Sequence, residues 1–264
     1  MHASPRQIPN RMNHNRQTYD AYALQYHKKR TCEEDNLWNL YLDRPMIQNL
    51  MGGPATGTKV LDLGCGSGLL TRWLKNQGLD ACGVDFSSGL IDIARGESPD
   101  IDFTISDINS TPYANGSFDI VVSGLVMHYM QDLGPVFAEV ARILGANGVF
   151  VFTMHHPFDE VMKVAWKGKA HAATLRPYFH NDRYTWTMLE GMRLVSYHHT
   201  FEAIVESLFR NGFTVERMAE SRAADGLRKR YPRFHARTNQ YPSFCGFRAR
   251  VRTCSAAPVP RARR

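Results

Sequence analysis

Acidic residues and glycines stand in this chain at spacings that could bind a ligand with positive charge. The stretch VLDLGCGSG, residues 60–68, holds Asp62 and then three glycines within five residues, Gly64, Gly66 and Gly68. Glycines have no Cβ, so a ligand can approach their backbone closely, and they permit positive φ. A helix that begins after such a turn directs its unpaired N–H groups to the same place. The spacing predicts a ligand-binding turn.

Two further aspartates end strand-like segments. Asp85 follows Gly64 by 21 residues, where a carboxylate can accept hydrogen bonds from both hydroxyls of a ribose. Asp107 ends the next segment, in SDIN. The turn reads G-x-G-x-G rather than G-x-G-x-x-G, and acidic side chains beside it would repel a pyrophosphate. They suit a ligand with a cationic end, and S-adenosylmethionine carries both an ammonium and a sulfonium.

Histidines are the candidates for acid–base chemistry, because an imidazole titrates near neutral pH. We predict catalytic roles for His128, His156 and His198, with His155 as a further candidate and a structural role as the alternative for each. The adjacent pairs 155–156 and 198–199 lack the helical spacing of metal ligands, and the carboxylates are assigned to the cofactor. We therefore expect no metal site.

The segments that would position these residues alternate between strand-like and helix-like patterns. Such alternation predicts an α/β fold, a doubly wound and mostly parallel sheet with right-handed crossovers. Its ligands are expected beyond the carboxyl ends of the strands. The expected strands are Val60–Leu63, Ala81–Phe86, Asp102–Asp107, Phe118–Ser123 and Val149–Met154, and the helices between them are Leu69–Gln77, Ser88–Arg95 and Gly134–Leu144.

Regions outside this alternation are harder to assign. Residues 15–30 and 36–51 look like amphipathic helices, which either pack on the main domain or cover the ligand. Residues 157–199 are rich in His, Trp, Tyr and Arg without a clear period. A helix over Phe201–Arg210, capped by Thr200, is then followed by strands over Thr214–Ala219 and Ser243–Val251.

Composition limits the class of protein. The chain has 264 residues, 43% of them hydrophobic, which is enough for one main domain with a small appendage. No apolar run is long enough to cross a bilayer and the first residues are polar, so we expect a soluble, cytoplasmic protein. Five scattered cysteines without a C-x-x-C pair favour neither disulfides nor zinc.

The net charge of +7 is unevenly distributed. Residues 228–264 hold eleven Lys and Arg and no Asp or Glu, whereas residues 58–155 hold five basic and eleven acidic residues. The predicted ligand-binding domain is itself acidic, and the basic end is typical of a solvated or disordered tail. The net positive charge alone is therefore no reason to expect a nucleic acid as a partner.

Several ordered motifs resemble those of the class I S-adenosylmethionine-dependent methyltransferases, in particular bacterial small-molecule enzymes of the type 11 and type 25 kind. The resemblance covers about residues 19–157. It is carried by VLDLGCGSG, GVDFSSGLIDIAR, ISDINSTPYANGSFDIVVSGLVMHYM and LGPVFAEVARILGANGVFVFTMHHP. VSYHHTFEAIVESLFRNGFTVERMAES and PSFCGFRARV are similar to the C-terminal half of those enzymes, although their usual Tyr-His-Arg-Thr reads Tyr-His-His-Thr at 197–200.

This resemblance implies a Rossmann-like, seven-stranded sheet with an antiparallel last strand, and it implies roles for individual residues. The turn residues would flank the methionine part of the cofactor, Asp85 would hold the ribose, Phe86 would pack on the adenine, and Asp107 with Ile108 would read the adenine edge. Aromatic residues of the N-terminal YDxxAxxY pattern would close over it. The implied cofactor-binding residues are Tyr19, Tyr26, Asp62, Gly64, Cys65, Gly66, Gly68, Asp85, Phe86, Asp107, Ile108, Gly124 and Leu125.

The function favoured by these patterns is methyl transfer from S-adenosylmethionine to an O, N or C atom of a small molecule, for example a secondary metabolite. The alternatives are an RNA methyltransferase and a non-catalytic cofactor-binding partner protein; a homo-oligomer stays open. The expected acceptor wall combines His128, His155 and His156 with aromatic residues of the 157–199 segment, which are Trp166, Tyr178, Phe179, Tyr184, Trp186 and Tyr197.

The expected organisation has three parts. Residues 1–50 form a helical cap, and residues 51–253 form the methyltransferase domain, in which 157–199 is an insertion after the fifth strand that forms the substrate pocket. Residues 254–264 form a basic tail without a periodic apolar face, which is expected to be disordered and dispensable for folding.

Overall fold

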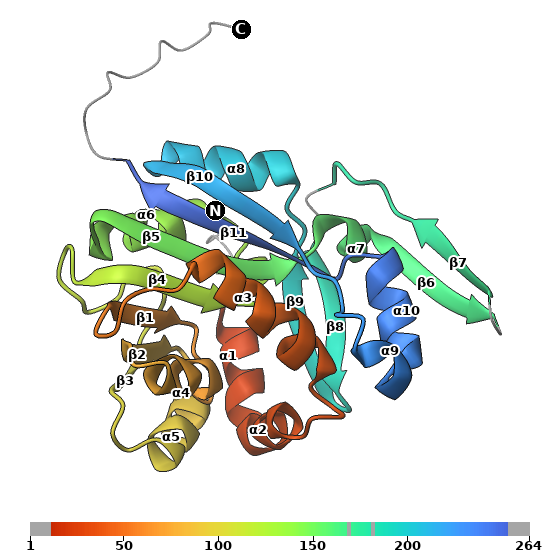
Figure 1. The fold of residues 1–264 in the computed structure, drawn as a ribbon, viewed down its shortest axis with the longest axis horizontal. Coiled ribbons are helices and arrows are strands. Elements are labelled where there is room, and N and C mark those ends of the chain that lie inside the picture. Colours follow the sequence, from red (N-terminus) through yellow and green to blue (C-terminus); the bar gives the residue numbers. More distant parts are fainter. Residues whose placement is uncertain (1–11, 168–169, 181–182, 253–264) are drawn as a thin grey trace, which may run out of the picture.

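A seven-stranded sheet forms the centre of the computed structural model, which describes residues 12–167, 170–180 and 183–252 (Figure 1). Its strands are β1 (Lys59–Leu63), β2 (Asp80–Asp85), β3 (Phe103–Ile105), β4 (Phe118–Gly124), β5 (Leu144–His155), β10 (Phe213–Glu220) and β11 (Phe244–Val251). Their order across the sheet is β10-β11-β5-β4-β1-β2-β3. The predicted doubly wound α/β fold is confirmed.

The direction of the strands also agrees with prediction. Strands β1 to β5 run parallel, and β11 lies antiparallel to both of its neighbours, β5 and β10. The chain moves outward from β1 to β3 and then returns to β4 on the other side of β1. Such a reversal of strand order opens a crevice at the carboxyl ends of the two central strands.

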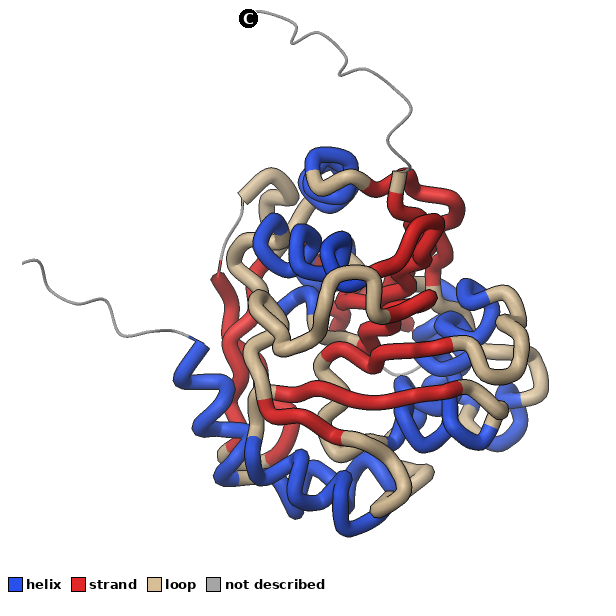
Figure 2. The backbone as a smooth tube through the Cα atoms, turned by 90° about the vertical axis from the view of Figure 1, so that its left-hand side faces the viewer, coloured by secondary structure: helices blue, strands red, loops and turns tan. Residues whose placement is uncertain are grey.

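Alternating side chains of β5 supply both halves of the core. Val149 and Val151 belong to a buried cluster with α3 (Arg44–Met51) and α4 (Leu69–Asn76). Phe150 and Phe152 belong to the cluster on the opposite face, with α6 (Gly134–Ile143) and α8 (Phe201–Arg210). Successive residues of a strand point to opposite faces, so a strand with apolar residues at every position is buried on both sides. Figure 2 shows helices on both sides of the strands.

The helical elements before β1 partly differ from prediction. Residues 15–30 form two helices, α1 (Met12–Ala21) and α2 (Ala23–Thr31), with a break at Tyr22. A π-helical turn, η1 (Asn39–Asp43), leads into α3, which packs on β5 and β11. Thus α3 covers the sheet, and the boundary at residue 50 between a cap and a main domain stays a proposal. The short helix α5 (Ser88–Glu97) begins at Ser87, whose Oγ accepts a hydrogen bond from the N–H of Leu90.

The segment without a clear sequence period forms a short helix and two hairpins. They are α7 (Pro157–Val161), the hairpin of β6 (Met162–Lys167) with β7 (Ala170–Leu175), and the hairpin of β8 (Arg183–Leu189) with β9 (Met192–Tyr197). In Figure 1 the first hairpin extends away from the sheet, while β8 and β9 lie close to the ends of the central strands. Between β10 and β11 the structure adds two helices that were not predicted, α9 (Leu227–Arg230) and α10 (Pro232–Gln240). The predicted tail, residues 254–264, lies outside the described residues.

Candidate functional site

Two adjoining cavities lie where the sheet order reverses. The larger has a volume of about 590 Å³ and the smaller one of about 70 Å³. Residues of the glycine turn, of the end of β4 and of the N-terminal helices line both of them. The shared lining residues are Tyr19, Tyr26, Gly64, Gly66, Gly124, Leu125 and Tyr129.

The three glycines of the turn have different roles. All adopt positive φ, at 81° for Gly64, 55° for Gly66 and 78° for Gly68. A Cβ at Gly64 would lie 2.5 Å from Val126, and one at Gly68 would lie 2.8 Å from the ring of Phe103. Gly64 and Gly66 line the cavities, whereas Gly68 lines neither and begins α4. Gly68 thus allows close packing of α4, and its predicted ligand role stays a prediction.

The smaller cavity gathers the residues predicted to hold a nucleoside. Asp85, Phe86 and Ile108 all line it. The carboxylate of Asp85 accepts hydrogen bonds from the N–H of Gly66 and of Ser87, each at 2.9 Å. Burial raises the pKa of Asp85 to about 6, and the backbone hydrogen bonds partly oppose this shift. These two bonds fix the carboxylate at the edge of the cavity.

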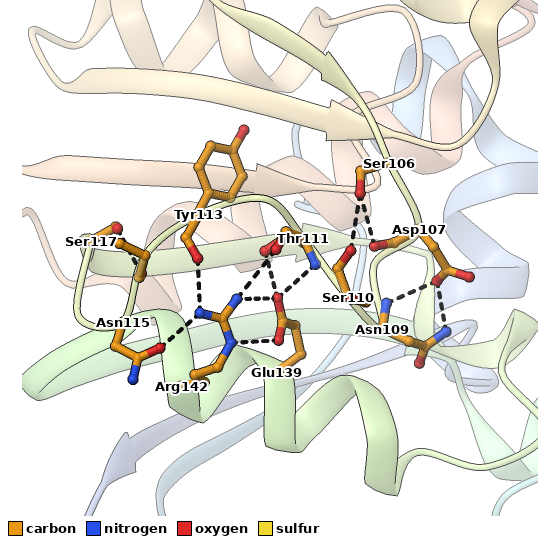
Figure 3. A network of polar contacts seen from close by, with 11 residues as sticks. Ser106, Asp107, Asn109, Ser110, Thr111, Tyr113, Asn115, Ser117, Glu139 and Arg142 are labelled. Atoms are coloured by element: carbon orange, nitrogen blue, oxygen red, sulfur yellow. Dashed lines mark hydrogen bonds and ion pairs between the residues drawn. The ribbon is translucent and has the colours of Figure 1, made fainter.

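Asp107 does not take part in this lining. Its Oδ1 accepts hydrogen bonds from the backbone N–H and the side-chain amide of Asn109, and the residue is exposed (Figure 3). The loop after it is fastened to α6, because Glu139 accepts from the N–H and the hydroxyl of Thr111 and also pairs with Arg142. The side chain of Asp107 thus shapes a local turn, and the prediction that it reads a ligand edge is not supported by its position.

Two more carboxylates lie buried on the other side of the turn. Asp62 accepts a hydrogen bond from the hydroxyl of Thr71 at Oδ2, and its Oδ1 has no partner within the described part of the chain. Asp43, from η1, accepts from the hydroxyl of Thr153. Burial raises the pKa of Asp62 to about 7 and that of Asp43 to about 6. Both line the larger cavity, which therefore has an acidic end with an unsatisfied oxygen.

A cation lies beside this acidic end. Arg30 of α2 lines the larger cavity, with its guanidinium carbon 5.7 Å from the ring centre of Tyr26. Its Nε is buried and has no hydrogen-bond partner among the residues that the structure describes. An unpaired carboxylate oxygen and an unpaired guanidinium nitrogen in one cavity are complementary to the ammonium and the carboxylate of an amino acid.

The N-terminal helices close over the turn through specific contacts. Asp20 accepts hydrogen bonds from the hydroxyl of Ser87 at 2.7 Å and from the N–H of Gly89 at 3.1 Å, at the start of α5. His27 bonds to the hydroxyl of Ser67 in the turn itself, at 2.9 Å. Among the interpretations of residues 15–30, the structure favours a cover over the cavities.

Aromatic rings of this cover surround the junction of the two cavities. Tyr19 packs edge-on against Tyr26, with ring centres 5.3 Å apart, and against Phe86, with centres 6.1 Å apart. The hydroxyls of Tyr19 and Tyr129 are 2.8 Å apart and hydrogen-bonded. Burial raises the pKa of Tyr19, so its hydroxyl stays protonated and the ring neutral. Rings of this kind can stabilise a neighbouring cation through their faces.

Backbone strain marks the end of β4. Leu125 has φ of 58°, which is rare for a bulky side chain. Its N–H donates to the carbonyl of Thr153 and to the Thr153 hydroxyl, each at 3.1 Å. The hydroxyl of Thr153 in turn donates to Asp43, so the strained residue and the buried acid are held by the same side chain. Gly124 and Leu125 are thus fixed at the edge of the larger cavity.

Two histidines form part of the wall of the larger cavity. His128 is 1% exposed, and neither of its ring nitrogens has a partner within the described ranges. Its ring stacks on that of His155, with centres 3.7 Å apart and an angle of 8° between planes. Burial and the neighbouring His155 lower the pKa of His128, and burial lowers that of His155 to about 4. Both rings are therefore neutral at pH 7.

The other two predicted catalytic histidines lie outside the lining of this cavity. His156 accepts a hydrogen bond from the N–H of Phe158 at the start of α7, and its Nε2 contacts Glu220 at 2.9 Å. His198 contacts Glu160 at 2.7 Å and the carbonyl of Tyr178 at 2.8 Å. Both nitrogens of each ring are thus engaged, which favours the structural alternative for His156 and His198, and their catalytic roles stay predictions.

Only part of the predicted aromatic wall lines the cavity. Tyr184 and Trp186 of β8 do so. Phe179 is 85% exposed, and Tyr178 instead packs against His198 and accepts the N–H of Phe201. Tyr197 is buried but does not line the cavity, and the side chain of Trp166 is not described.

Other lining residues were not predicted from the sequence. They are scattered along the chain, and no local motif marks them as ligands. Asp43 and the adjacent pair of Asp159 and Glu160 are acids within mostly apolar stretches, which is the one signal that could have drawn attention to them. The main unpredicted residues at the larger cavity are Arg30, Trp38, Asp43, Tyr129, Asp159, Glu160, Met188 and Phe244.

Comparison with known proteins agrees with this geometry. Residues 61–152 match the model of the family described as "Methyltransferase domain". The structure resembles an S-adenosylmethionine-dependent methyltransferase from Mesorhizobium loti at a TM-score of 0.68, with 26% identity over 78% of this chain and 96% of that one. The chain thus contains a methyltransferase domain and has the fold of S-adenosylmethionine-dependent methyltransferases.

Curated relatives of this methyltransferase differ in what they act on. A malonyl-[acyl-carrier protein] O-methyltransferase of Yersinia pestis is 27% identical over 67% of this chain and 65% of its own length. A magnesium-protoporphyrin O-methyltransferase of Rhodobacter capsulatus is 35% identical over 48% of this chain and 58% of its own length. The chain thus spans less than two thirds of the length of these relatives.

The described residues contain neither a group of metal ligands nor a membrane-spanning helix. Within residues 12–167, 170–180 and 183–252, no group of three or more His, Cys, Asp and Glu side chains could hold a metal ion. None of the helices described is both long and apolar enough to span a membrane. The absence of a metal and the cytoplasmic location stay predictions.

Proposed function

We propose that this methyltransferase binds S-adenosylmethionine and transfers its methyl group to a small organic molecule. The observation that carries the proposal is the pair of unsatisfied buried atoms, Asp62 Oδ1 and Arg30 Nε, in a cavity that opens from the glycine turn. Such atoms cost stability unless a ligand supplies their partners. The ammonium and carboxylate of the methionine part would supply both.

The described residues fit this cofactor along its whole length. Asp85 would accept hydrogen bonds from the ribose hydroxyls, and the apolar Phe86 and Ile108 of the smaller cavity would receive the adenine. Gly66 would admit the methionine part, because it has no Cβ on the side that faces Tyr26 and its φ of 55° disfavours any residue with one. When bound, the cofactor supplies a methyl group on a positively charged sulfur, which is already an activated leaving group.

What the protein contributes is orientation and exclusion of water. The contacts of Asp20 and His27 hold the N-terminal cover over the turn, and the rings of Tyr19, Tyr26 and Tyr129 line the junction of the two cavities. A methyl acceptor held in line with the carbon–sulfur bond reacts faster chiefly because its orientation is fixed in advance. This arrangement accounts for catalysis without an additional charged group at the methyl carbon.

The acceptor is proposed to be a small metabolite rather than a nucleic acid. The remaining part of the larger cavity is lined by Tyr184, Trp186, Met188, Phe244 and the stacked histidines. A pocket of this size and composition suits a planar organic molecule, for example a secondary metabolite. Several of the basic residues that suggested RNA are paired nearby, since Arg230 pairs with Glu33 and Arg237 with Asp159.

Isothermal calorimetry with S-adenosylmethionine and its demethylated product tests the cofactor part of the proposal. Wild-type protein should bind both, and Asp62→Asn should lose at least tenfold in affinity for each of them, since each carries the ammonium. Transfer of a labelled methyl group to a panel of small organic acceptors, followed by mass spectrometry, tests the enzyme part. Binding without transfer to any acceptor would favour a non-catalytic partner protein, and transfer to RNA alone would favour the nucleic-acid alternative.

A further inference from the structure

A chain of four polar side chains extends from the wall of the larger cavity into the protein. His155 Nδ1 lies 3.1 Å from the hydroxyl of Tyr184, and that hydroxyl donates to Glu160 Oε1 at 3.0 Å. Glu160 Oε2 lies 2.7 Å from His198 Nδ1. The side chains of Glu160 and His198 are only 2% and 4% exposed. Strand β8, helix α7, the end of β5 and the residue after β9 bring these four groups together.

The direction of the hydrogen bonds fixes the tautomer of His155. The single hydroxyl proton of Tyr184 goes to Glu160, so its oxygen accepts from Nδ1–H of His155. A neutral imidazole has one N–H, and burial lowers the pKa of His155 to about 4, so the ring is neutral at pH 7. Its Nε2 therefore carries a free lone pair, and no hydrogen bond to this atom exists within the described part of the chain.

At the His198 end of this series of hydrogen bonds, His198 and Glu160 share one proton. His198 Nε2 must donate to the carbonyl of Tyr178, because a carbonyl only accepts. The contact between His198 Nδ1 and Glu160 then requires one further proton, held by either the imidazole or the carboxyl. Burial raises the pKa of Glu160, and the hydrogen bond from His198 opposes this. The pair is thus neutral as a whole and can exist in the protein interior without an unpaired charge.

Aromatic rings surround His155 on the wall of the larger cavity. Its ring is nearly parallel to those of His128, at 3.7 Å and 8°, and of Phe244, at 6.0 Å and 14°. Trp186 meets it edge-on at 5.2 Å. These residues line the larger cavity together with Gly124 and Leu125, which end β4 beside the cofactor side. A flat acceptor that packs on these rings would bring a ring substituent to the imidazole edge.

We propose that His155 is the base that accepts the proton of a phenolic hydroxyl during methyl transfer, and that Tyr184, Glu160 and His198 are positioning residues for it. The inference rests on the proposed function. In the step, the acceptor oxygen forms a bond to the methyl carbon while the carbon–sulfur bond breaks and its electron pair remains on sulfur. The hydroxyl proton moves to Nε2 of His155 and leaves to water after the product departs.

A phenol fits this arrangement better than the other acceptor types. A phenol has a pKa near 10, as in tyrosine, and its hydroxyl becomes far more acidic as the oxygen gains the methyl group, so even the weakly basic imidazole of His155 can accept the proton during transfer. An amine attacks with a lone pair that is already free and needs no base at that moment. A carboxylate acceptor is already ionised at neutral pH and has no proton for a base to remove.

The tautomer is tested directly by ¹⁵N NMR of histidine-labelled full-length protein without an acceptor. His155 should show a protonated Nδ1 and an unprotonated Nε2, assigned by comparison with His155→Gln. Tyr184→Phe should shift the ring toward the other tautomer, whereas Tyr113→Phe, outside the cavity, should leave it unchanged. A protonated Nε2 in the wild-type protein overturns the proposal, whatever the result for cofactor binding.

The role in transfer is tested with matched phenols and anilines, such as 1-naphthol and 1-naphthylamine, and S-adenosylmethionine. We expect transfer to phenols, with kcat reduced at least 100-fold in His155→Gln and KM and cofactor affinity nearly unchanged. His14→Gln, an exposed histidine on α1, is the control. Transfer to anilines alone, transfer to neither class while the cofactor binds, or full activity of His155→Gln overturns the proposal. If the wild-type protein does not bind the cofactor, the proposed function itself is refuted.

Discussion

Asp62 is buried with one carboxylate oxygen satisfied and the other free, and its pKa is raised to about 7. A cationic ligand group binds the ionised form, so the affinity for S-adenosylmethionine should rise as the pH increases from 6 to 8. Below the pKa the gain should approach tenfold per pH unit. Calorimetry at several pH values checks this, and Asp62→Asn should show weak affinity with a much flatter pH profile. An equally steep profile in the variant would assign the titration to another group.

The same residue affects the stability of the ligand-free protein with the opposite sign. Its pKa rises from 3.8 in the unfolded chain to about 7 in the fold, so the folded state binds more protons and this contribution to stability falls as the pH rises through that window. Asp62→Asn should therefore raise Tm at pH 8, by about 2–4 °C for each kcal/mol recovered, and have little effect at pH 4. Thermal unfolding without ligand at the two pH values measures the difference.

Asp85 is proposed to bind the ribose, so its contribution to cofactor affinity can be measured separately from that of the charged groups on the methionine part. Asp85→Ala removes the acceptor for two ribose hydroxyls, each bond contributing about 1.5–3 kcal/mol, and should reduce cofactor affinity by tenfold or much more. It also frees the N–H groups of Gly66 and Ser87, so circular dichroism must show that the fold remains. Unchanged affinity by calorimetry would show that the ribose is bound elsewhere.

At the scale of single elements, the glycine turn depends on both backbone conformation and space. Gly64→Ala should place a methyl group 2.5 Å from Val126 at a φ of +81°, and should destabilise the protein by about 1–3 kcal/mol while weakening cofactor binding. Gly96→Ala is the control, because a Cβ at this helical position meets no atom within 4 Å. It should leave binding intact and stabilise by about 0.4–1 kcal/mol. Chemical denaturation and calorimetry distinguish the two variants.

Asp20 of α1 makes hydrogen bonds to the start of α5. Asp20→Ala removes the acceptor for the Ser87 hydroxyl and the Gly89 N–H, so the cover should open more often while the sheet keeps its stability. We expect faster hydrogen exchange over residues 12–31 and at least threefold weaker cofactor affinity. Arg16→Ala is the matched control and should change neither quantity by much, because among the described residues Arg16 has one ion pair, the 4.0 Å contact with Asp20. No change in exchange for Asp20→Ala would show that apolar packing alone holds the cover.

Helices and strands with strong local sequence patterns could be predicted from the sequence. Which residues line the cavity could not. The parallel strands were predicted within a few residues, because β-branched and aromatic runs mark strands buried on both faces. His155 and His156 were both placed at the end of β5, but one residue along a strand reverses the direction of the side chain. Only the pairing of His155 with Phe244 on β11 determines which histidine faces the cavity. Because the paired residues are distant in sequence, no local sequence pattern predicts this pairing.

For the whole molecule, segments from both ends of the chain meet behind Trp38, which lines the larger cavity. Trp38 packs edge-on against Phe234 of α10, with ring centres 4.9 Å apart. Glu33 accepts hydrogen bonds from Tyr41 and from Tyr231, at 2.5 and 3.0 Å, and pairs with Arg230 at 2.9 Å. The basic residues near 228–237 looked from the sequence like part of a solvated tail. Tertiary contacts across about 200 positions override that local reading, as they often do for short helices.

Glu33 thus connects α9 and α10 to the loop before η1. Its loss should loosen these contacts, which lie close to Trp38 of the larger cavity, without unfolding the core. In Glu33→Gln we expect faster hydrogen exchange over residues 227–240 and faster dissociation of S-adenosylmethionine in stopped-flow measurements. The Tm should stay within about 1 °C, since the contacts of Glu33 lie near the surface and exposed pairs contribute little to global stability. Glu34→Gln, its exposed neighbour, is the control. Since salt screens an exposed ion pair, added salt should move the wild type toward the variant. Dissociation rates that are identical in all three proteins would show that the cofactor leaves by another route, on the side of the smaller cavity.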